Sequence, residues 1–268
     1  MTVTKISNSI HGQKSHYDVL AQRGDAHVIH HNKLLQNMNL KVLMSLPRSI
    51  YYNFKCLPFA QAIKIPILIG KNVKIRGSFH RNSIVIDAPE VCRGMVSLGI
   101  NDGSFEMGSS MPSYIRMSGD ARIVFHGHCL ISNGIKIDVS HSGALHIGKG
   151  VFVNSNSIIS SNGMVRFGDG VSTGWNITVI DWDGHDIVDL AIKSVVNAPK
   201  PIIIGDHCWL GSHSTLLKGV CLAHHCIVPY GSIISKSCDT PIAVYGGMPN
   251  HVLCTGKVRT DMMEGLDE

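Results

Sequence analysis

A six-residue repeat of apolar side chains is the sequence feature that most limits how this chain can fold. From residue 204 the chain can be written in sixes: IGDHCW, LGSHST, LLKGVC, LAHHCI, VPYGSI and ISKSCD. The first position is aliphatic in every six: Ile204, Leu210, Leu216, Leu222, Val228 and Ile234. The fifth is small or medium-sized: Cys208, Ser214, Val220, Cys226, Ser232 and Cys238. Such a repeat predicts a solenoid, in which each unit buries its apolar face by stacking on its neighbours.

The same period appears upstream in three longer units, which begin at Phe125, Ile147 and Phe167 and are offset by 22 and 20 residues. Every sixth position of these units is apolar or small: Phe125, Ile131, Ile137, Ile147, Val153, Ile159, Phe167, Thr173 and Val179. We interpret each unit as one coil of three short strands with a slightly enlarged corner. A weaker copy lies at 69–77. Between residues 78 and 122 the period is blurred, and DGSFEMGSSMPSY predicts an irregular coil or loop.

The composition agrees with stacked strands and argues against a nucleic-acid partner. Of the 268 residues, 44% are hydrophobic, only 16% are charged and 6% are aromatic, and 27 are glycine, which suits close strands with tight turns better than a helical bundle. The net charge is +5, but Lys and Arg are scattered and form no basic arm. A small positive excess also suits a phosphate-bearing cofactor or an acidic glycan.

The cysteines and the apolar segments predict a cytoplasmic protein. None of the eight cysteines forms a CxxC pair, and the first 30 residues lack the apolar run of a signal peptide, so we expect reduced, buried thiols. No apolar run reaches the ~18–20 residues of a membrane helix. The segment 39–68, which mixes basic and apolar residues, is predicted to cap the core. Peripheral association of this segment with the inner membrane is the alternative.

The repeat resembles that of the hexapeptide-repeat acyltransferases, in which an aliphatic residue, a small residue, two free positions and another small residue recur. The resemblance covers residues 125–256 well and 69–124 loosely. It implies an all-β fold, a left-handed parallel β-helix with three strands per coil, although parallel crossovers are usually right-handed. We therefore expect a partly helical N-terminal cap at 1–65, a β-helix domain at 66–256 and a C-terminal tail at 257–268.

The period is interrupted over residues 181–201, and IGDHCWLGS then restores it. Insertions in a solenoid form loops on one face, often the working face, so an extended loop is expected here. The segment begins with several aspartates and ends in APKP, whose prolines stiffen the return into the array. It contains His185 in the run DWDGHDI. One histidine among 16 decides little alone, but a neutral imidazole is suited to accept a proton near neutral pH.

The resemblance adds a catalytic interpretation of this loop. In relatives that acetylate maltose, galactosides and bacterial surface polysaccharides, an extended loop carries a histidine before an IGDxxWIG coil. His185 would then be the general base that deprotonates the acceptor hydroxyl as its oxygen attacks the thioester carbonyl of acetyl-CoA. Asp183 or Asp181 would hold its tautomer, and a backbone carbonyl would serve equally. The resemblance also implies that the Ser212 backbone N–H, in WLGS, stabilises the oxyanion.

The binding residues are likewise implied by the resemblance. Acceptor contacts are expected from Asn176, Trp182 and Trp209. Acetyl-CoA is expected in a groove between neighbouring prisms, against Trp209, Gly211, Tyr230, Gly231, Ser235 and Lys236. The chain departs from many relatives in having PYGS in place of GAGS and GMPNHVL in place of GNPAKVI, so the bulk of Tyr230 alters the expected cofactor path. Family members are homotrimers with active sites between subunits, and no metal is expected.

Three other functions remain open at this stage. A metalloenzyme of the γ-carbonic-anhydrase kind needs histidines at set coil positions; His141 with His146, and His207 with His213, are spaced for it, but no third histidine joins them. An N-acetyltransferase of an amino-sugar nucleotide would show the same features, and a non-catalytic β-helix that binds a partner would explain the repeat alone. Packing explains the repeat cysteines better than a nucleophilic role does.

The favoured interpretation is an acetyl-CoA-dependent O-acetyltransferase. Its acceptor would be a sugar hydroxyl of a bacterial surface polysaccharide, such as a capsule, exopolysaccharide or O-antigen, or of a precursor of one.

Overall fold

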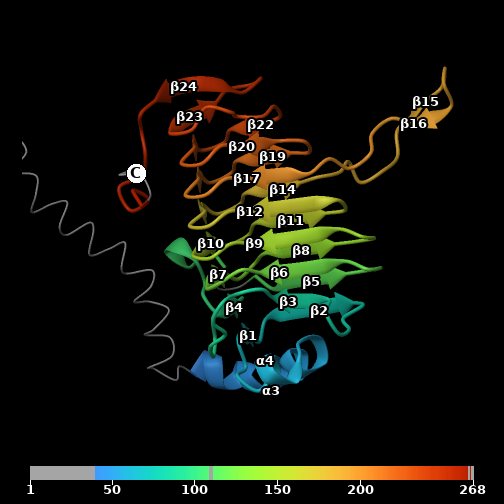
Figure 1. Cartoon of the computed structure of the whole chain (residues 1–268), viewed down its shortest axis with the longest axis vertical. Helices are drawn as coiled ribbons and strands as arrows, with labels where there is room; N and C mark the ends of the chain where they lie inside the picture. Colours follow the sequence, from blue (N-terminus) through green and yellow to red (C-terminus); the bar gives the residue numbers. More distant parts are fainter. Residues whose placement is uncertain (1–39, 109–110, 265, 267–268) are drawn as a thin grey trace, which may run out of the picture.

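The computed structural model describes residues 40–108, 111–264 and 266 of the chain. The chain winds as a left-handed parallel β-helix, the fold that the resemblance implied. Successive strands pass from one sheet to the next, so three sheets form the faces of a prism (Figure 1). We call these faces sheet A, sheet B and sheet C, in the order in which the chain first enters them.

Each sheet is a parallel ladder with one strand from each coil, apart from the antiparallel strand β24 at the end of sheet A. Sheet A contains β1 Ile67–Ile69, β4 Val96–Leu98, β7 Cys129–Ile131, β10 Val151–Val153, β13 Ser172–Thr173, β18 Trp209–Leu210, β21 Ile227–Val228, β23 Ala243–Gly246 and β24 His251–Thr255. Sheet B contains β2 Val73–Gly77, β5 Ser113–Met117, β8 Lys136–Val139, β11 Ile158–Ser161, β14 Thr178–Ile180, β19 Thr215–Leu217 and β22 Ile233–Ile234. Sheet C contains β3 Ile84–Ile86, β6 Arg122–Phe125, β9 Ala144–Ile147, β12 Met164–Phe167, β17 Ile202–Ile204 and β20 Cys221–Leu222.

The repeat positions line the inside of the prism. The aliphatic first positions from Ile204 to Ile234 are each at most 1% exposed, and the small fifth positions are buried beside them. The ladder register stacks aliphatic side chains of successive coils on one another. Ile159, for example, pairs with Ile137 on one side and Val179 on the other. Because alternate strand residues face opposite sides, one inward side chain per short strand builds a continuous apolar column. The predicted repeat is therefore confirmed.

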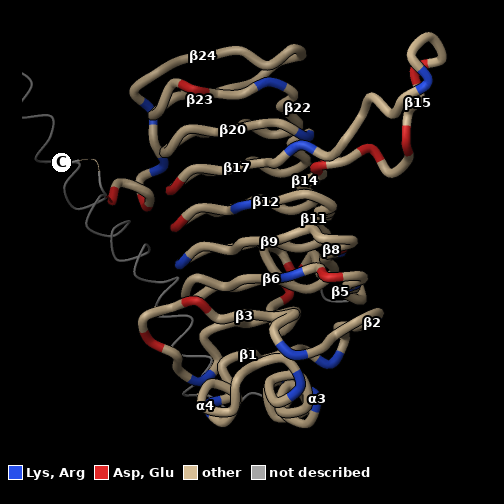
Figure 2. The backbone as a smooth tube through the Cα atoms, turned by 45° about the vertical axis from the view of Figure 1, so that its right-hand side comes forward, with Lys and Arg blue, Asp and Glu red and all other residues tan. Residues whose placement is uncertain are grey.

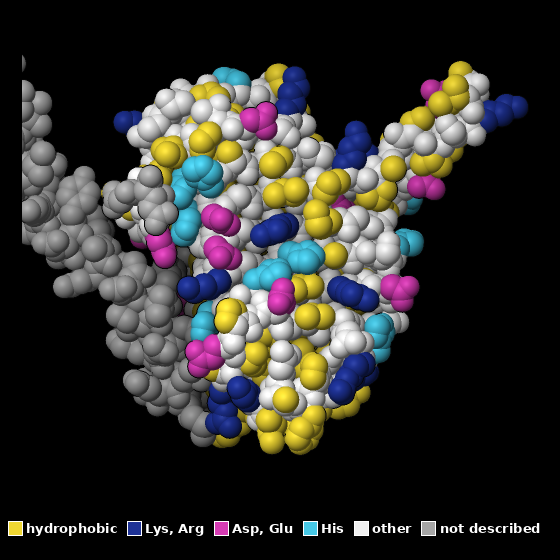
Figure 3. Space-filling view, in the orientation of Figure 1, with side chains coloured by type: hydrophobic (Ala, Val, Ile, Leu, Met, Phe, Trp, Pro, Cys, Tyr) yellow, Lys and Arg dark blue, Asp and Glu magenta, His cyan; other side chains and the backbone are white. Residues whose placement is uncertain are grey.

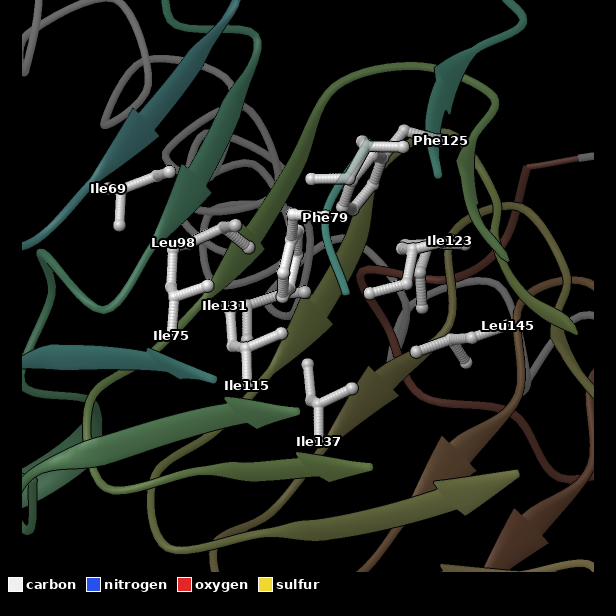
Figure 4. A pocket seen from close by; sticks show the side chains of 12 residues that line it. Ile69, Ile75, Phe79, Leu98, Ile115, Ile123, Phe125, Ile131, Ile137 and Leu145 are labelled. Atoms are coloured by element: carbon white, nitrogen blue, oxygen red, sulfur yellow. The ribbon is translucent and has the colours of Figure 1, made fainter. Parts of the chain in front are cut away.

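The interior is filled by this column. Figure 4 shows aliphatic and phenylalanine side chains from the three sheets converging in the first coils. The space left among them is about 10 Å³ and only apolar groups line it. Such a void is no larger than one water-sized probe, so the side chains fill this part of the core.

Several histidines turn the corners of the prism. At the corner between sheets A and B, equivalent turn positions with positive φ are occupied by Gly134, Asn156, Asn176, His213 and Gly231. His207 and His225 have the same left-handed backbone between sheets C and A, as His141 has between sheets B and C. Glycine adopts this conformation freely, and Asn and His are enriched among the other residues that do. The backbone thus explains these histidines without a metal, and His207 and His213 lie at different corners.

The segment from 78 to 122 is more regular than the blurred period predicted. β3 pairs with β6 through Ile84↔Ile123, and β5 pairs with β8 through Ile115↔Ile137, so the ladders run through this segment unbroken. The corners between these strands are longer than elsewhere, which shifts the six-residue spacing without shifting the register. The predicted irregular part is real around the short 3₁₀ helix η1, Ser104–Glu106.

Two helices close the N-terminal end of the prism: α3, Leu40–Cys56, and α4, Phe59–Ala62. Asn53 of α3 accepts a hydrogen bond from the Ile67 N–H (3.1 Å) and donates one to the Ile67 carbonyl (2.7 Å), so the helix satisfies the edge of β1. Residues 1–39 of the expected cap lie outside the described residues, and the domain boundaries stay a prediction. Neither described helix has the length and apolar content needed to cross a membrane.

The cysteines are free, but their burial differs from the prediction. No cysteine in the chain forms a disulfide in this structure, and five are buried. Cys221 and Cys254 are exposed and Cys92 is partly exposed, so the expectation of buried thiols is wrong for these three. Cys221 is exposed because it precedes the inward Leu222 of the repeat and points out of sheet C.

Candidate active site

The interruption after β14 is a long arm that leaves the prism between sheets B and C. It contains a two-stranded hairpin, β15 Val188–Asp189 and β16 Ser194–Val195, which lies well away from the coils in Figure 1. Hydrophobic side chains run along it in Figure 3, and they are largely exposed: Ile187, Val188, Leu190, Ile192, Val195 and Val196. An exposed apolar arm of this kind needs a covering surface.

Asp181 fastens the start of this arm. Its side chain is fully buried and accepts hydrogen bonds from the backbone N–H groups of Asn162 (2.8 Å) and Gly163 (2.9 Å) and from the Ser161 hydroxyl (2.9 Å). These bonds take both carboxylate oxygens, so they tie the arm to the coil below. The sequence left open whether Asp181 or Asp183 contacts the ring of His185. In the structure Asp181 does not contact it, because both of its carboxylate oxygens bind the coil below.

Asp183 belongs to a tether at the base of the arm. Its carboxylate forms an ion pair with Lys218 and accepts a hydrogen bond from the Asn197 amide (2.8 Å). Both contacts hold the pKa of Asp183 below its usual range, and the Lys218 contact has the larger effect. Asn197 also donates to the His185 carbonyl (2.8 Å). The two sides of the arm are thus joined, but the Asp183 carboxylate is engaged with these groups and not with the ring of His185.

His185 is exposed, and within the described part of the chain its ring makes no hydrogen bond. Trp182, three residues earlier, lies against the outer surface of sheet B, where its indole N–H donates to the Ser160 hydroxyl (2.8 Å). The arm thus presents one anchored aromatic side chain and one free imidazole.

A second group of predicted residues meets at the corner between sheets A and B. The Asn176 amide lies 3.1 Å from the His213 ring nitrogen, and the His213 ring lies 5.0 Å from that of Tyr230. Ser212 is only 8% exposed, yet its backbone N–H has no partner among the described residues. A buried N–H without a partner is costly, and a ligand oxygen would satisfy it.

Glycines make room at this corner. A Cβ on Gly174 would lie 2.2 Å from the Ser212 hydroxyl oxygen, and a Cβ on Gly211 would lie 2.7 Å from the Tyr230 nitrogen. Gly231 has φ +68, a conformation that suits glycine, and open space where a side chain would be. Tyr230 beside it is 68% exposed. The corner is therefore tight between coils and open toward the outside.

The remaining predicted residues lie elsewhere. Trp209 is on the outer surface of sheet A, where the Arg259 guanidinium lies 5.6 Å from its ring. Ser235 and Lys236 follow β22 at the corner between sheets B and C, and their N–H groups donate to the Asn250 side chain (2.9 and 3.0 Å). One chain thus divides the expected cofactor residues among three places.

His185 and Ser212 are also separated within one chain. Asn176 precedes β14 and Trp182 follows it, and these six residues span at most about 20 Å, the length of a fully extended chain. His185 is beyond Trp182, whereas Ser212 lies on the Asn176 side of sheet B. The two predicted catalytic groups therefore lie beyond opposite ends of the sheet B strands.

Sequence reasoning missed four residues of these clusters: Asn197, Lys218, His213 and Arg259. Lys218 occupies a repeat position where any residue is allowed, and Arg259 lies in the C-terminal tail. No sequence pattern therefore singles out either residue. His213 was noted only for its spacing from His207, whereas its partner is Asn176 on the neighbouring coil. Among the described residues, no group of three or more His, Cys, Asp or Glu side chains is arranged to hold a metal ion.

Comparisons with known proteins bear on the fold and on the sequence similarity of the chain. No family model matches the chain. The galactoside O-acetyltransferase of Escherichia coli (strain K12) is 31% identical over 114 residues, which are 42% of this chain and 55% of that protein. The polysialic acid O-acetyltransferase of Neisseria meningitidis is 27% identical over 123 residues, which are 44% of this chain and 57% of that protein. The chain thus spans about half the length of the curated relatives it matches.

A solved structure supports the fold. The crystal structure of the polySia-specific acetyltransferase NeuO superposes with a TM-score of 0.53 at 19% identity and covers 70% of this chain and 71% of that one. The predicted resemblance is therefore confirmed: the chain is similar in sequence to sugar O-acetyltransferases and shares the β-helix fold of a hexapeptide-repeat acetyltransferase.

Proposed function

We propose that the protein is an acetyl-CoA-dependent O-acetyltransferase that acylates a sugar hydroxyl of a bacterial surface polysaccharide or its precursor. The observation that carries this proposal is the unpartnered backbone N–H of the largely buried Ser212, in the coil that follows an arm bearing a free imidazole, His185. The names of the relatives, galactoside and polysialic acid O-acetyltransferase, supply the reaction class and the kind of acceptor.

The corner between sheets A and B fits the end of a thioester arm. The space outside Gly231 is open, the neighbouring Tyr230 ring is exposed, and the Ser212 N–H lacks an acceptor. Acetyl-CoA would supply the acetyl group as an activated thioester. Lys236 is exposed at the next corner of the same coil, where a cationic side chain suits a phosphate.

The residues of the chain then have separate tasks in the transfer. His185 accepts the proton of the acceptor hydroxyl as that oxygen attacks the acyl carbonyl, a contribution worth ~10²–10⁴ in rate. The C–S bond then breaks, and CoA leaves as its thiol with the proton that His185 returns. The Ser212 N–H donates to the carbonyl oxygen as negative charge develops on it. Asp183 and Asn197 position the backbone around His185 through the tether to Lys218.

We further propose that the two halves of the site come from neighbouring copies in a homotrimer. Within one chain, the arm and the Ser212 corner lie on either side of the segment from Asn176 to Trp182, which spans at most about 20 Å. The exposed apolar side chains of the arm need a covering surface, and a second copy of the chain would supply it. The partner's Ser212 corner would then receive His185.

Calorimetric titration with acetyl-CoA tests the function. We expect micromolar binding near one site per chain, and weaker binding when Gly231→Val fills the open corner. Absence of binding at millimolar acetyl-CoA by a folded oligomer would contradict the proposal. Acetyl transfer only to the amine of an amino-sugar nucleotide would replace it with N-acetylation.

The helical end is proposed to touch a membrane surface. Large apolar side chains are exposed on α3 and α4: Leu43, Met44, Ile50, Tyr51, Phe54 and Phe59. Residues 40–64 contain Lys41, Arg48, Lys55 and Lys64 but no acidic residue. Lys41 pairs with Asp102 and Arg48 donates to the Lys71 and Val73 carbonyls, so Lys55 and Lys64 remain for lipid headgroups. Cations beside exposed apolar side chains suit the interface of anionic lipid. A cytoplasmic location is part of this proposal, and the free cysteines are compatible with it.

Co-sedimentation with vesicles of mixed neutral and anionic lipid tests this second proposal. The intact protein should bind, and Phe54→Ser with Phe59→Ser should weaken binding, while the same change at the distant, exposed Leu253 should not. No binding by the intact protein would contradict it.

A further inference from the structure

Outward side chains form two straight rows across sheet B. The ladder register aligns the first row as Lys74, Tyr114, Lys136, Ile158, Thr178, Thr215 and Ile233. It aligns the second as Arg76, Arg116, Asp138, Ser160, Ile180 and Leu217. The first three strands contribute four cations to these rows and the later strands contribute none. Figure 2 shows Lys and Arg gathered on the coils beside α3.

The basic part of these rows lines an open groove of about 530 Å³. Its walls are Lys74, Arg76, Tyr114, Ile115, Arg116, Lys136, Ile137, Asp138, Ile158, Ile159, Ser160 and Ile180. We call it the sheet B groove. Its lining residues come from five neighbouring strands of sheet B, β2, β5, β8, β11 and β14, so it runs across five coils.

The charges in the sheet B groove are mostly uncompensated. Arg116 pairs with Asp138, with its Nε 2.9 Å from the carboxylate. Lys74, Arg76 and Lys136 form no ion pair among the described residues. This surface therefore presents three cations that lack a carboxylate partner, beside one arginine that has one.

An aromatic ring lies among these cations. The Lys74 ammonium is 3.4 Å from the Tyr114 hydroxyl and 5.3 Å from the ring centre, and the Arg76 guanidinium is 5.6 Å from that centre. Carboxylates suit Lys and Arg side chains, and the apolar face of a pyranose ring packs on an aromatic ring. Lys74 and Lys136 are two strand spacings apart, about 10 Å, so repeated carboxylates fit better than a single one.

The groove leads to the proposed site. Its far end is formed by Ser160 and Ile180, and Ser160 is the residue to which the Trp182 indole donates (2.8 Å). Trp182 begins the arm that carries His185 three residues later. A chain lying in the groove would thus pass from the cations to the base of the catalytic arm.

We propose that the sheet B groove binds an acidic polysaccharide, a chain of sugars with repeated carboxylates, and guides its hydroxyls to His185. This inference rests on the proposed function and names the acceptor class. A second copy of the chain is a poor occupant of the basic end, because each copy carries a net charge of +5. The uncharged rows at β14, β19 and β22 suit a subunit contact better.

Binding of polysialic acid, compared with neutral dextran, tests the groove without activity. The test variant is Lys74→Gln, Arg76→Gln and Lys136→Gln together; the matched control is Lys149→Gln, Arg166→Gln and Lys257→Gln, exposed cations outside the sheet B groove. We expect salt-sensitive binding of polysialic acid only, weakened about tenfold in the test variant and unchanged in the control, because exposed charge contacts contribute modestly each. In transfer assays the KM for polysialic acid should rise about tenfold, with kcat and acetyl-CoA affinity unchanged.

The outcomes separate this inference from the proposed function. Equal binding of polysialic acid by the test variant and the wild type would overturn the groove, as would equal binding of dextran by the wild type. A test variant that dissociates into monomers would assign the surface to the subunit interface and overturn it too. Failure to bind acetyl-CoA with intact, variant-sensitive glycan binding would instead overturn the catalytic proposal.

Discussion

Asp181 and His185 are four residues apart in the same arm, and the fold uses their side chains in opposite ways. Asp181 is buried and accepts three hydrogen bonds, whereas His185 is exposed and its ring has no partner among the described residues. A buried, fully bonded carboxylate stabilises structure, and a free imidazole at a surface is available for proton transfer. The sequence could not show whether Asp181 or Asp183 contacts His185, because both lie within four residues before it.

Asp181→Asn should destabilise the protein. The amide has one carbonyl oxygen in place of two carboxylate oxygens, so at least one backbone N–H at 162–163 loses its acceptor. We expect a loss of about 1–3 kcal/mol in the free energy of unfolding, measured by urea denaturation. Asp186→Asn, an exposed control in the same arm, should change stability little, and equal losses would contradict the anchoring role.

His185→Ala should abolish most of the transfer while leaving the donor bound. The kcat should fall by ~10²–10⁴, because a positioned general base is lost, with the acetyl-CoA affinity unchanged. Steady-state kinetics and calorimetry together measure both. His141→Asn, a corner histidine replaced by a residue that tolerates its positive φ, is the control. Undiminished kcat in His185→Ala would exclude this residue as the base.

The tether of Asp183 gives the arm a pH dependence with a defined sign. The hydrogen bonds from Lys218 and Asn197 lower the pKa of Asp183, so folding favours its ionised form. That contribution is fully present above the ordinary carboxyl pKa, about 4, and is lost as the pH falls through the lowered pKa. Limited proteolysis of 181–201 should therefore accelerate only below about pH 4. In Lys218→Gln it should be fast at neutral pH too, and equal rates would contradict the tether.

At the scale of elements, the arm combines a rigid base with an unsupported apolar hairpin. Leu190 is 87% exposed and Ile192 is 66% exposed, the positions that most need a covering surface. Leu190→Ser with Ile192→Ser should shift the proposed trimer toward monomer at low concentration, as measured by sedimentation velocity. The β-helix of each copy should keep its thermal unfolding transition. A trimer unaffected by both changes would show that the hairpin is not the contact.

The elements that the sequence predicted best are those with one inward residue per six. The strands from β17 to β22 follow that rule, and every predicted inward position from Ile204 to Ile234 is buried. β3, β4 and β5 escaped prediction because long corners shift the count while the ladder keeps its register. A periodic pattern reports spacing along the chain, whereas sheet register depends on contacts between coils.

Across the whole molecule, the site could be predicted only in part. The break in the repeat predicted the arm, and the coil that follows it pointed to Ser212, whose catalytic role stays a prediction. The tether residues Asn197 and Lys218 lie 21 positions apart and carry no motif, so only the fold brings them together. The sheet B groove escaped prediction for the same reason: its cations are scattered along the sequence and align only through parallel pairing.

The separation of His185 from Ser212 gives the account its most direct test, acetyl transfer by mixed oligomers. Two inactive variants, His185→Ala and Ser212→Pro, which lacks the N–H, are co-expressed and the hetero-oligomers purified. If each site joins the arm of one copy to the corner of another, every mixed trimer has one intact site of its three, so the purified hetero-oligomers should show about a third of wild-type activity. Mixed oligomers as inactive as either parent, beside an active wild type, would contradict a site shared between copies. A wild type that transfers no acetyl group would contradict the proposed function itself.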